Sequence, residues 1–239
     1  MRTVAVVLAG GSGRRFGGDR PKQLHSLGGR SVLARCAETF GQAPGVDGVL
    51  VVTAAEVADE VRGQLAACPG LTAVIEGGTA RTDSTRAAIA WLTARAADGT
   101  VSPDCKVLFH DAARPLVDQR IIADCIQGLD NWDAVGVVVP SADTIVELDG
   151  GAFGRVLARD SLARCQTPQG FRLPVISRAY ELAAADPGFA ARPATDDCGV
   201  VLRYLPTVRV GAVPGSERNL KITYAADLAV AETLLGLDD

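Results

Sequence analysis

Glycine and positive charge are concentrated in one stretch near the start of the chain, VVLAGGSGRRFGGDRPKQL (residues 6–24). Because Gly10, Gly11 and Gly13 have no side chains, successive backbone N–H groups there can turn toward an anion. Arg15 and Lys22 add fixed positive charge beside that turn. The spacing departs from the P-loop pattern, and the arginines are foreign to a dinucleotide fingerprint. The stretch therefore predicts a cradle for a polyphosphate.

The elements that must position these residues alternate between two types. Short runs rich in Val, Ile and Leu predict strands at residues 3–9, 49–53, 71–75, 106–110 and 134–139. Longer segments with helical apolar spacing lie between them at residues 31–40, 55–66, 82–97 and 119–129. This alternation predicts βαβ units, and hence an α/β fold with a mostly parallel sheet flanked by helices.

Ligands of such a sheet bind beyond the carboxyl ends of its strands. The glycine loop follows the first predicted strand. Further polar segments follow the third, fourth and fifth, namely EGGTARTDS (76–84), HDAARP (110–115) and PSADTI (140–145). The residues that could bind a ligand or take part in a reaction are therefore expected at one edge of the sheet.

After Pro140 the rhythm changes. Residues 143–166 predict a polar hairpin around Asp149-Gly150-Gly151, with too few apolar residues for a core of its own. We expect this arm to pack on another subunit. Helical pattern returns at 173–184, a strand is expected near 207–210, and a last helix is expected at about 224–235.

The composition excludes several classes of protein. A chain of 239 residues with 48% hydrophobic and 22% charged residues is typical of a soluble globular protein. Its net charge of −4 argues against a nucleic-acid partner. The sequence has neither a signal peptide nor ~18 uninterrupted apolar residues, so we expect no membrane partner and a cytoplasmic location. Six cysteines without a CxxC pair and two histidines indicate neither a zinc site nor a disulfide framework.

Seven segments occur in the order and approximate spacing of a known enzyme family. They are LAGGSGRRFGGDRPKQ, GGTARTDS, HDAARP, DTI, QTPQGF, TDD and NLKIT. Over nearly its whole length the chain thereby resembles the 2-C-methyl-D-erythritol 4-phosphate cytidylyltransferases. The resemblance implies a single cytidylyltransferase domain over residues 1–239, with a Rossmann-like sheet of the nucleotidyltransferase type. It also implies a homodimer and a protruding β-hairpin dimerisation arm at about 141–165.

The reaction implied by the resemblance is transfer of CMP from CTP to a phosphate monoester, with Mg²⁺ or another divalent cation. Because a phosphate is already an anionic nucleophile, the obstacle is repulsion between two polyanions, and the remedy is fixed positive charge. By this resemblance the catalytic residues are Arg15, Lys22 and Lys221. The implied nucleotide-binding residues are Ala9, Gly10, Gly11, Ser12, Gly13, Gly78 and Ser84.

The acceptor site is also implied by the resemblance, which assigns it Asp111, Arg114, Thr144, Arg159 and Thr167. Asp111 is in addition the expected metal-binding carboxylate, and Arg159 is expected to reach across from the neighbouring subunit. A salt bridge that closes a strand end is the alternative for the pair Asp111 and Arg114.

Other residues keep more than one interpretation. Ser84 could cap the helix after it, although Asp83 is the better candidate for that cap. Thr79 stands where some relatives carry an acidic residue, which leaves its part in base recognition open. Asp196 and Asp197 could form a carboxylate pair near the metal or cap the start of a helix.

Two acceptors are compatible with the motifs. HDAARP, RTDS, QTPQGF and TDD favour 2-C-methyl-D-erythritol 4-phosphate, whereas LAGG, DTIVE and NLKITY resemble the related ribitol 5-phosphate cytidylyltransferases. Val146 stands where the methylerythritol enzymes commonly have lysine. Cytidylyl transfer to methylerythritol phosphate is therefore the first expectation, and CDP-ribitol synthesis is the alternative.

Overall fold

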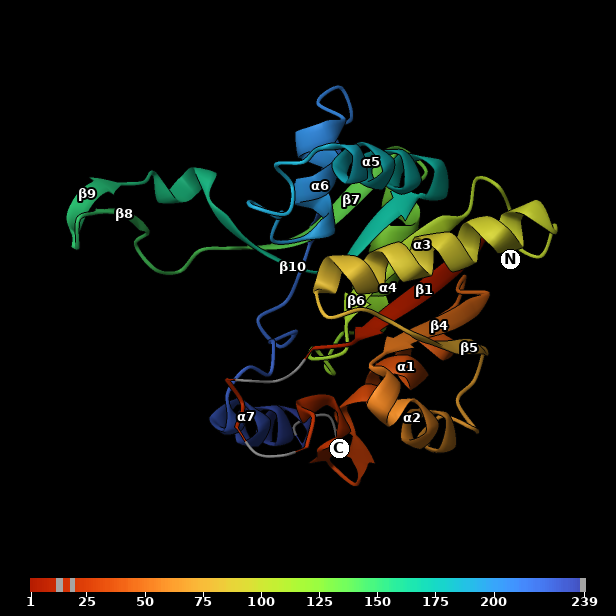
Figure 1. The fold of residues 1–239 in the computed structure, drawn as a ribbon. Helices are drawn as coiled ribbons and strands as arrows, with labels where there is room; N and C mark the ends of the chain where they lie inside the picture. The colour runs from red at the N-terminus through yellow and green to blue at the C-terminus, as the bar shows by residue number, and fades with distance from the viewer. Residues whose placement is uncertain (12–14, 18–19, 237–239) are drawn as a thin grey trace.

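Residues 1–11, 15–17 and 20–236 are described by the structure, a computed structural model of the chain. Within these ranges a seven-stranded sheet forms the centre, in the order β11-β7-β10-β6-β1-β4-β5 (Figure 1). Its strands are β1 (Thr3–Ala9), β4 (Gly48–Thr53), β5 (Leu71–Glu76), β6 (Lys106–Asp111), β7 (Ala134–Pro140), β10 (Ala163–Arg172) and β11 (Val210–Pro214). β10 runs antiparallel to β6 and β7, and the other pairings in this sheet are parallel.

Helices cover both faces of the sheet, because the central strands are apolar on both sides. Along β1 the residues 5, 7 and 9 belong to one buried cluster, and residues 4, 6 and 8 belong to another. The first cluster packs against α1 (Val32–Gly41), α2 (Ala58–Gln64) and α4 (Gln119–Gly128). The second packs against α3 (Arg81–Ala97), α5 (Leu173–Ala185) and α6 (Asp197–Tyr204) (Figure 1). In the described residues the short 3-10 helices are η1 (Lys22–Leu24) and η2 (Ala55–Val57) in the body and η3 (Arg159–Ser161) on the arm.

Polar side chains fix the starts of two helices. The hydroxyl of Ser31 accepts the N–H of Ala34 at 3.1 Å where α1 begins. The carboxylate of Asp118 accepts the N–H of Ile121 at 2.8 Å where α4 begins. Each contact satisfies a backbone donor that the helix itself leaves unpaired.

The last helix, α7 (Ala225–Leu235), lies away from the sheet and packs beside a small hairpin of β2 (Ser26–Leu27) and β3 (Arg30–Ser31). A third buried cluster joins these elements and consists of Leu27, Val32, Ile222 and Ala231. The helix α7 is thus held against the segment that follows the glycine loop.

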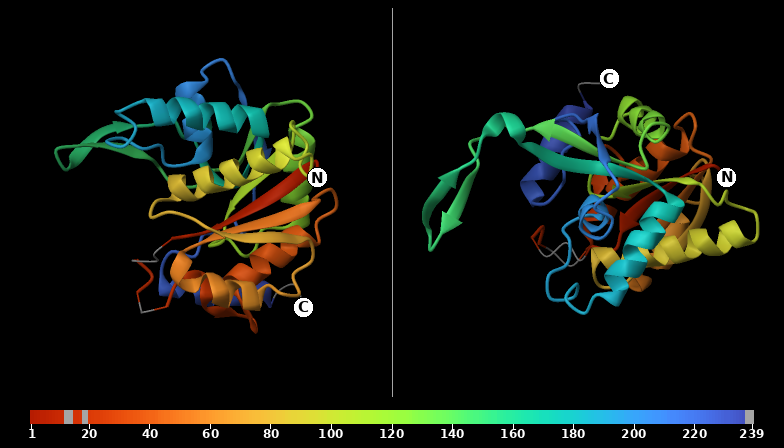
Figure 2. Two further views of the ribbon diagram at one scale, coloured as in Figure 1. Left: turned by 45° about the vertical axis from the view of Figure 1, so that its right-hand side comes forward. Right: turned by 90° about the horizontal axis from the view of Figure 1, so that it is seen from above.

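A second hairpin, formed by β8 (Val146–Asp149) and β9 (Ala152–Val156), extends away from the sheet (Figure 1; Figure 2). Gly150 and Gly151 make its turn with φ of 56° and 88°, values that glycine adopts without strain. The hairpin has few contacts with the body, as its shape in both figures shows.

One face of this hairpin is apolar. Leu148 is paired with Phe153 and Val146 with Val156, and cross-strand partners point to the same side of a two-stranded sheet. Leu148 is 70% exposed, Phe153 77% and Val156 62%. We call Val146, Leu148, Phe153 and Val156 the arm face.

The predicted fold class is confirmed, and the strands and helices predicted before Pro140 lie within about three residues of their predicted bounds, whereas η1, β2 and β3 have no predicted counterpart. The dimerisation arm expected at about 141–165 stays a prediction, and the last three residues of that range belong to β10 (Ala163–Arg172) in the structure. The strand predicted near 207–210 begins at Val210 instead. The helix α6 has no counterpart among the predicted elements. None of the helices in the described residues is long and apolar enough to cross a membrane.

Candidate active site

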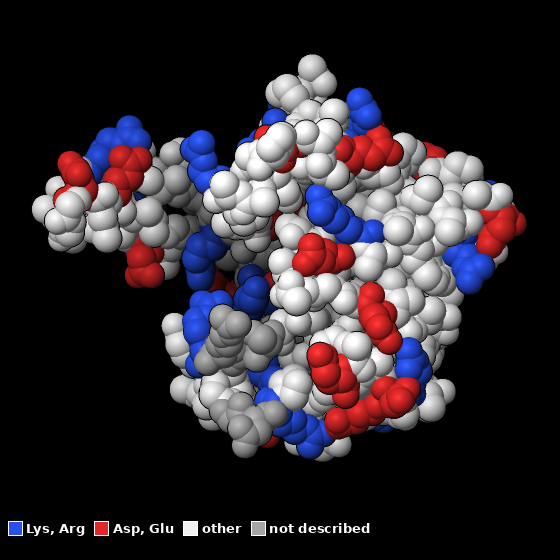
Figure 3. Space-filling model, viewed as in Figure 1, with Lys and Arg blue, Asp and Glu red and all other residues white. Residues whose placement is uncertain are grey.

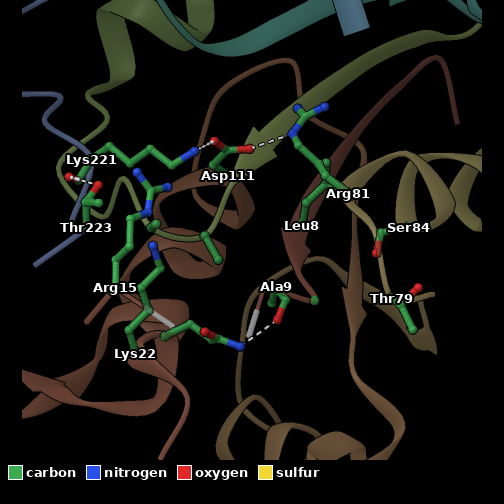
Figure 4. A pocket seen from close by; sticks show the side chains of 15 residues that line it. Leu8, Ala9, Arg15, Lys22, Thr79, Arg81, Ser84, Asp111, Lys221 and Thr223 are labelled. Atoms are coloured by element: carbon green, nitrogen blue, oxygen red, sulfur yellow. Dashed lines mark hydrogen bonds and ion pairs between the residues drawn. The ribbon is translucent and has the colours of Figure 1, made fainter. Parts of the chain in front are cut away.

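A pocket opens at the carboxyl ends of β1 and β6, at the edge of the sheet where the sequence predicts it (Figure 4). Its walls come from the glycine loop, the start of α3, the end of β6 and the turn before α7. The side chains that give it chemical character are Arg15, Lys22, Arg81, Ser84, Asp111 and Lys221. In Figure 3, Lys and Arg side chains gather around a hollow beneath the base of the arm.

Three predicted cationic residues meet in this pocket. Arg15 and Lys22 come from the glycine loop and Lys221 from the far end of the chain (Figure 4). The Nζ of Lys22 donates to the carbonyl oxygen of Ile222 at 2.8 Å. Burial lowers the pKa of Lys22, and the nearby charge of Lys221 lowers it further. Such crowding of like charges favours the binding of an anion.

A buried amide fastens the glycine loop to the end of β1. The side chain of Gln23 is 3% exposed and donates from Nε2 to the carbonyl oxygen of Ala9 at 2.6 Å. The contact joins the two ends of the loop, so it fixes where Lys22 projects. Sequence analysis missed Gln23, although it belongs to the quoted segment.

The opposite wall of the pocket is formed by backbone and by the hydroxyl side chains of Thr79 and Ser84. Ser84 is 2% exposed, and its Oγ has no hydrogen-bond partner among the described residues. A Cβ atom placed on Gly10 would lie 2.8 Å from that Oγ, so the glycine is needed for the close approach. The N-cap residue of α3 is Ala80, and the side chain that caps the helix is Asp83, whose carboxylate accepts the N–H of Ala80 at 3.0 Å. Ser84 is therefore left with a free buried hydroxyl beside Gly10.

Asp111 sits between two cations. Its Oδ2 accepts from the Nζ of Lys221 at 2.6 Å, and its Oδ1 accepts from the Nε of Arg81 at 3.0 Å (Figure 4). Burial raises the pKa of a carboxyl group, but here the charges of Arg81 and Lys221 outweigh it and hold the pKa of Asp111 well below its usual range. Asp111 is therefore a fixed negative charge.

Arg81 continues this arrangement away from the pocket. Its Nη2 lies 2.8 Å from Oδ2 of Asp197, a carboxylate with no exposed surface. The neighbouring Asp196 caps α6 by accepting the N–H of Gly199 at 2.7 Å. Of the two interpretations of the acidic pair, capping thus holds for Asp196, while Asp197 pairs with an arginine. Sequence analysis did not single out Arg81, which lies inside GGTARTDS.

Two predicted acceptor residues lie behind the pocket wall. The hydroxyl of Thr167 accepts the N–H of Asp111 and contacts Nδ1 of His110, both at 3.1 Å. The Nη1 of Arg114 donates to the carbonyl oxygen of Asn219 at 2.8 Å. Neither Thr167 nor Arg114 lines the pocket in the single chain.

The remaining predicted residues fall elsewhere. Thr144 and Arg159 are exposed at the base of the arm, where Nη1 of Arg159 donates to the carbonyl oxygen of Ala142 at 3.3 Å. Ala9, Gly10 and Gly11 line the pocket, and the carbonyl oxygen of Gly78 faces Gly10. The predicted residues Ser12 and Gly13 lie outside the described residues.

The donor set of the pocket limits how a metal could bind. The described residues contain no group of three or more His, Cys, Asp or Glu side chains that could hold one. Asp111 is the acidic side chain in the pocket lining, and each of its oxygens already faces a cation. Mg²⁺ needs only one or two carboxylates where substrate phosphates supply further oxygens. The residues therefore fit a Mg²⁺ that binds together with a triphosphate.

Comparisons with known proteins agree with this geometry. The family model "IspD: 2-C-methyl-D-erythritol 4-phosphate cytidylyltransferase" matches residues 3–237. A protein of that name from Thermobifida fusca is 48% identical over 98% of this chain and 93% of its own length. The structure of 4-diphosphocytidyl-2C-methyl-D-erythritol synthase from Anaerococcus prevotii superposes with a TM-score of 0.81 at 26% identity, over 98% of both chains.

A more distant relative carries the other predicted activity in its name. The bifunctional ribulose 5-phosphate reductase/CDP-ribitol pyrophosphorylase of Haemophilus influenzae is 33% identical over 98% of this chain, which spans 48% of that protein. The family model and the relatives of higher identity carry the same name, 2-C-methyl-D-erythritol 4-phosphate cytidylyltransferase. The chain belongs to the 2-C-methyl-D-erythritol 4-phosphate cytidylyltransferase family.

Proposed function

We propose that this protein transfers the cytidylyl group of CTP to 2-C-methyl-D-erythritol 4-phosphate and releases pyrophosphate. The observation that carries the proposal is the meeting of Arg15, Lys22 and Lys221 in one pocket, opposite the free hydroxyl of Ser84. Fixed cations on one wall suit a triphosphate, and backbone with a hydroxyl on the other suits a base.

The chemical step needs no nucleophile from the protein. A phosphate oxygen of the acceptor forms a bond with the α-phosphorus of CTP, and the bond from that phosphorus to the oxygen bridging to the β-phosphate breaks. The electron pair leaves with pyrophosphate, and no proton has to be removed from the nucleophile. Arg15, Lys22 and Lys221 stabilise the charge on the α-phosphate through this step.

Mg²⁺ is the proposed cofactor, and when bound it would neutralise part of the triphosphate charge. Asp111 is the carboxylate that would face it. The contacts of Asp111 with Arg81 and Lys221 keep that carboxylate ionised and in place. In the same contacts Asp111 holds Lys221 ready for the phosphates.

The nucleotide is proposed to bind along the glycine loop. Backbone groups of Ala9, Gly10 and Gly11 would lie beneath the phosphates and ribose, with Ser12 and Gly13 continuing the loop. Gly78 and the hydroxyl of Ser84 would contact the edge of cytosine. This assignment is supported because Ser84 has a buried hydroxyl without a partner, and such a group gains a full hydrogen bond when a ligand arrives.

The acceptor site is proposed to need two copies of the chain. Asp111, Arg114 and Thr167 lie near the pocket, whereas Thr144 and Arg159 are on the arm. The arm face exposes large apolar side chains, which favours a homodimer in which the arm covers the partner. Arg159 would then hold the acceptor phosphate of the partner's site.

The cysteines of the chain are all free. Free thiols are typical of proteins in a reducing compartment, and they support the proposal of a cytoplasmic location.

Methylerythritol phosphate is the favoured acceptor for two reasons. The relative at 48% identity is named for it, whereas the relative named for CDP-ribitol is 33% identical. Val146, the residue that suggests ribitol phosphate, pairs with Val156 in the arm and does not line the pocket of its own chain. The argument from Val146 is therefore the weaker one.

Pyrophosphate release tests the proposal. The protein is given CTP and Mg²⁺ with 2-C-methyl-D-erythritol 4-phosphate or D-ribitol 5-phosphate in separate reactions at matched concentrations. We expect release with the methylerythritol phosphate and at least tenfold slower release with ribitol phosphate, since a site built for one polyol leaves polar groups unpaired with another. Release with ribitol phosphate alone would overturn the acceptor assignment.

A further inference from the structure

Asp197 is a buried carboxylate that the proposed chemistry does not use. Its exposed fraction is 0%, and it is absent from the residues that line the pocket. Its Oδ1 accepts from the hydroxyl of Tyr180 at 2.6 Å and from the hydroxyl of Thr85 at 3.0 Å. Its own N–H donates to the side-chain oxygen of Gln169 at 3.0 Å. Side chains of α3 and α5 therefore hold the carboxylate, and a side chain of β10 holds the backbone of the same residue.

Arg81 connects Asp197 to the pocket, because it contacts both Asp197 and Asp111. One guanidinium group reaches both carboxylates, with Nε 3.0 Å from Asp111 and Nη2 2.8 Å from Asp197. A planar guanidinium can bridge two acids with its fork of N–H groups, whereas an ammonium group is a single point of charge. Burial lowers the pKa of Arg81, but the charges of Asp197 and Asp111 outweigh it and raise that pKa.

The last link is the contact between Asp111 and Lys221. Oδ2 of Asp111 lies 2.6 Å from Nζ of Lys221, and Lys221 stands on the turn before α7, outside the sheet. Charges along the chain of contacts alternate in sign from Asp197 to Arg81, Asp111 and Lys221. Asp197 and Asp111 are both buried, so either carboxylate left without its contact to Arg81 would be costly.

We propose that Asp197 is a positioning residue, which acts through Arg81 and Asp111 to hold the ammonium group of Lys221 at the phosphate site. The inference rests on the proposed function of Lys221 in cytidylyl transfer. It assigns to a carboxylate outside the pocket an effect on turnover, because a small displacement of a group that stabilises the transition state lowers the rate steeply.

A double-mutant cycle tests this proposal. The four proteins are the wild type, Asp197→Asn, Lys221→Ala and the double variant, each assayed for pyrophosphate release with CTP and methylerythritol phosphate. Asparagine keeps the acceptor oxygen for Tyr180 and Thr85 but removes the charge that Arg81 faces. We expect Asp197→Asn to lower kcat by roughly 10- to 100-fold with little change in the KM for CTP.

The decisive comparison is between the effect of Asp197→Asn on kcat in the wild type and its effect in the variant that lacks Lys221. In the Lys221→Ala background, Asp197→Asn should cost less than about threefold in kcat, because the group on which it acts is gone. A merely structural role would multiply the two losses. That result would overturn the inference.

Two further variants guard against trivial explanations. Arg86→Gln removes a charge from an exposed position of α3, the helix that carries Arg81. This variant should leave kcat unchanged. If Asp197→Asn does not fold, Thr85→Val replaces it in the cycle, since it removes one donor to Asp197 and keeps every charge. Its loss should be smaller and should again be absent without Lys221.

A second readout does not depend on turnover. Lys22, Lys106 and Lys221 are the lysines of the sequence, so a chain labelled with ¹³Cε-lysine gives a simple NMR spectrum, assigned with the variant Lys221→Arg. An anchored side chain shows two separate Hε signals. In Asp197→Asn the Hε signals of Lys221 should move together, while those of Lys106, paired with Asp130 at 2.6 Å, should stay in place.

The two readouts separate the inference from the proposed function. A wild-type protein that releases no pyrophosphate would overturn the proposed function, and the spectrum would still decide the role of Asp197. Unchanged Hε signals of Lys221 in the folded Asp197→Asn variant would overturn the inference, whatever the activity.

Discussion

Nζ of Lys22 lies 2.8 Å from the carbonyl oxygen of Ile222, although the two residues are 200 positions apart in the chain. The contact brings the end of the glycine loop next to Lys221, the residue before Ile222. Two lysines from opposite ends of the sequence thus face one pocket. Their like charges repel each other until an anion binds between them.

Replacing Lys22 by alanine should therefore cost turnover. If the lysine stabilises charge on the α-phosphate as a hydrogen-bond donor of an oxyanion hole does, the loss in kcat is about 100- to 1000-fold. The matched control is Lys106→Ala, because Lys106 is paired with Asp130 away from the pocket. Pyrophosphate release is measured for both variants, and near-normal turnover of Lys22→Ala would remove the residue from the mechanism.

Ser84→Ala should weaken CTP binding without harming the fold. The hydroxyl of Ser84 has no partner in the described residues, so its removal breaks no hydrogen bond of the free protein. Loss of one neutral hydrogen bond to the base costs about 1 kcal/mol, or roughly fivefold in the KM for CTP.

The control for this change is Ser177→Ala. Ser177 also has a buried Oγ without a partner, but it lies on α5 away from the pocket. Its KM for CTP should match that of the wild type, and the midpoints of thermal unfolding should agree for all three proteins. An unchanged KM in Ser84→Ala would count against the assignment of cytosine to this wall.

Phe153→Asp should separate the subunits of the proposed dimer. Phe153 is 77% exposed on the arm face, and a charge there cannot be buried against a partner without a large desolvation cost. Light scattering during gel filtration should give the mass of two chains for the wild type and of one chain for the variant. Turnover should fall with the mass if Arg159 completes the partner's site.

Arg155→Gln provides the comparison for the arm. Arg155 forms an exposed ion pair with Glu147, and exposed pairs contribute little to stability. This variant should remain dimeric and active. A wild-type protein that is fully active as a monomer would contradict the shared acceptor site.

Stability should fall in weak acid because of His110. Complete burial lowers the pKa of this imidazole from 6.5 to about 4, and the neutral ring contacts Thr167 and the carbonyl oxygen of Arg114. Below pH 6.5 the unfolded chain binds a proton that the folded chain refuses until about pH 4. The stabilisation is therefore complete above pH 6.5 and is lost as the pH falls toward 4.

Denaturant unfolding at pH 7 and pH 5 measures this effect. His110→Gln lacks the titrating ring but keeps an amide that can donate to the Arg114 carbonyl. Between the two pH values the wild type should lose about 2 kcal/mol more free energy of unfolding than the variant. Equal losses in the two proteins would show that His110 does not cause the acid sensitivity.

The difference between predictable and unpredictable parts has a physical origin. The strands before Pro140 are unbroken apolar runs, so each can be predicted from its own residues. β10 contains Gln166, Thr167 and Gln169, which are buried because distant segments supply their hydrogen-bond partners. No local pattern of alternation reveals such a strand.

The site divides in the same way. Arg15, Lys22 and Lys221 could be named from the resemblance, since each lies in a quoted motif. The role of Arg81 depends on Asp111 and Asp197, which stand 30 and 116 positions further along the sequence. An arginine that bridges two such distant acids is visible only once the chain has folded.

Because α7 packs against the hairpin after the glycine loop, the pocket can form only after two segments far apart in the sequence have both been synthesised. In chain order the glycine loop is synthesised about 200 residues before Lys221 and α7. Until the turn before α7 has folded, the pocket lacks the wall that carries Lys221, and Lys22 lacks the carbonyl oxygen of Ile222. A chain in which residues 221–235 have not yet folded is therefore expected to leave CTP untouched.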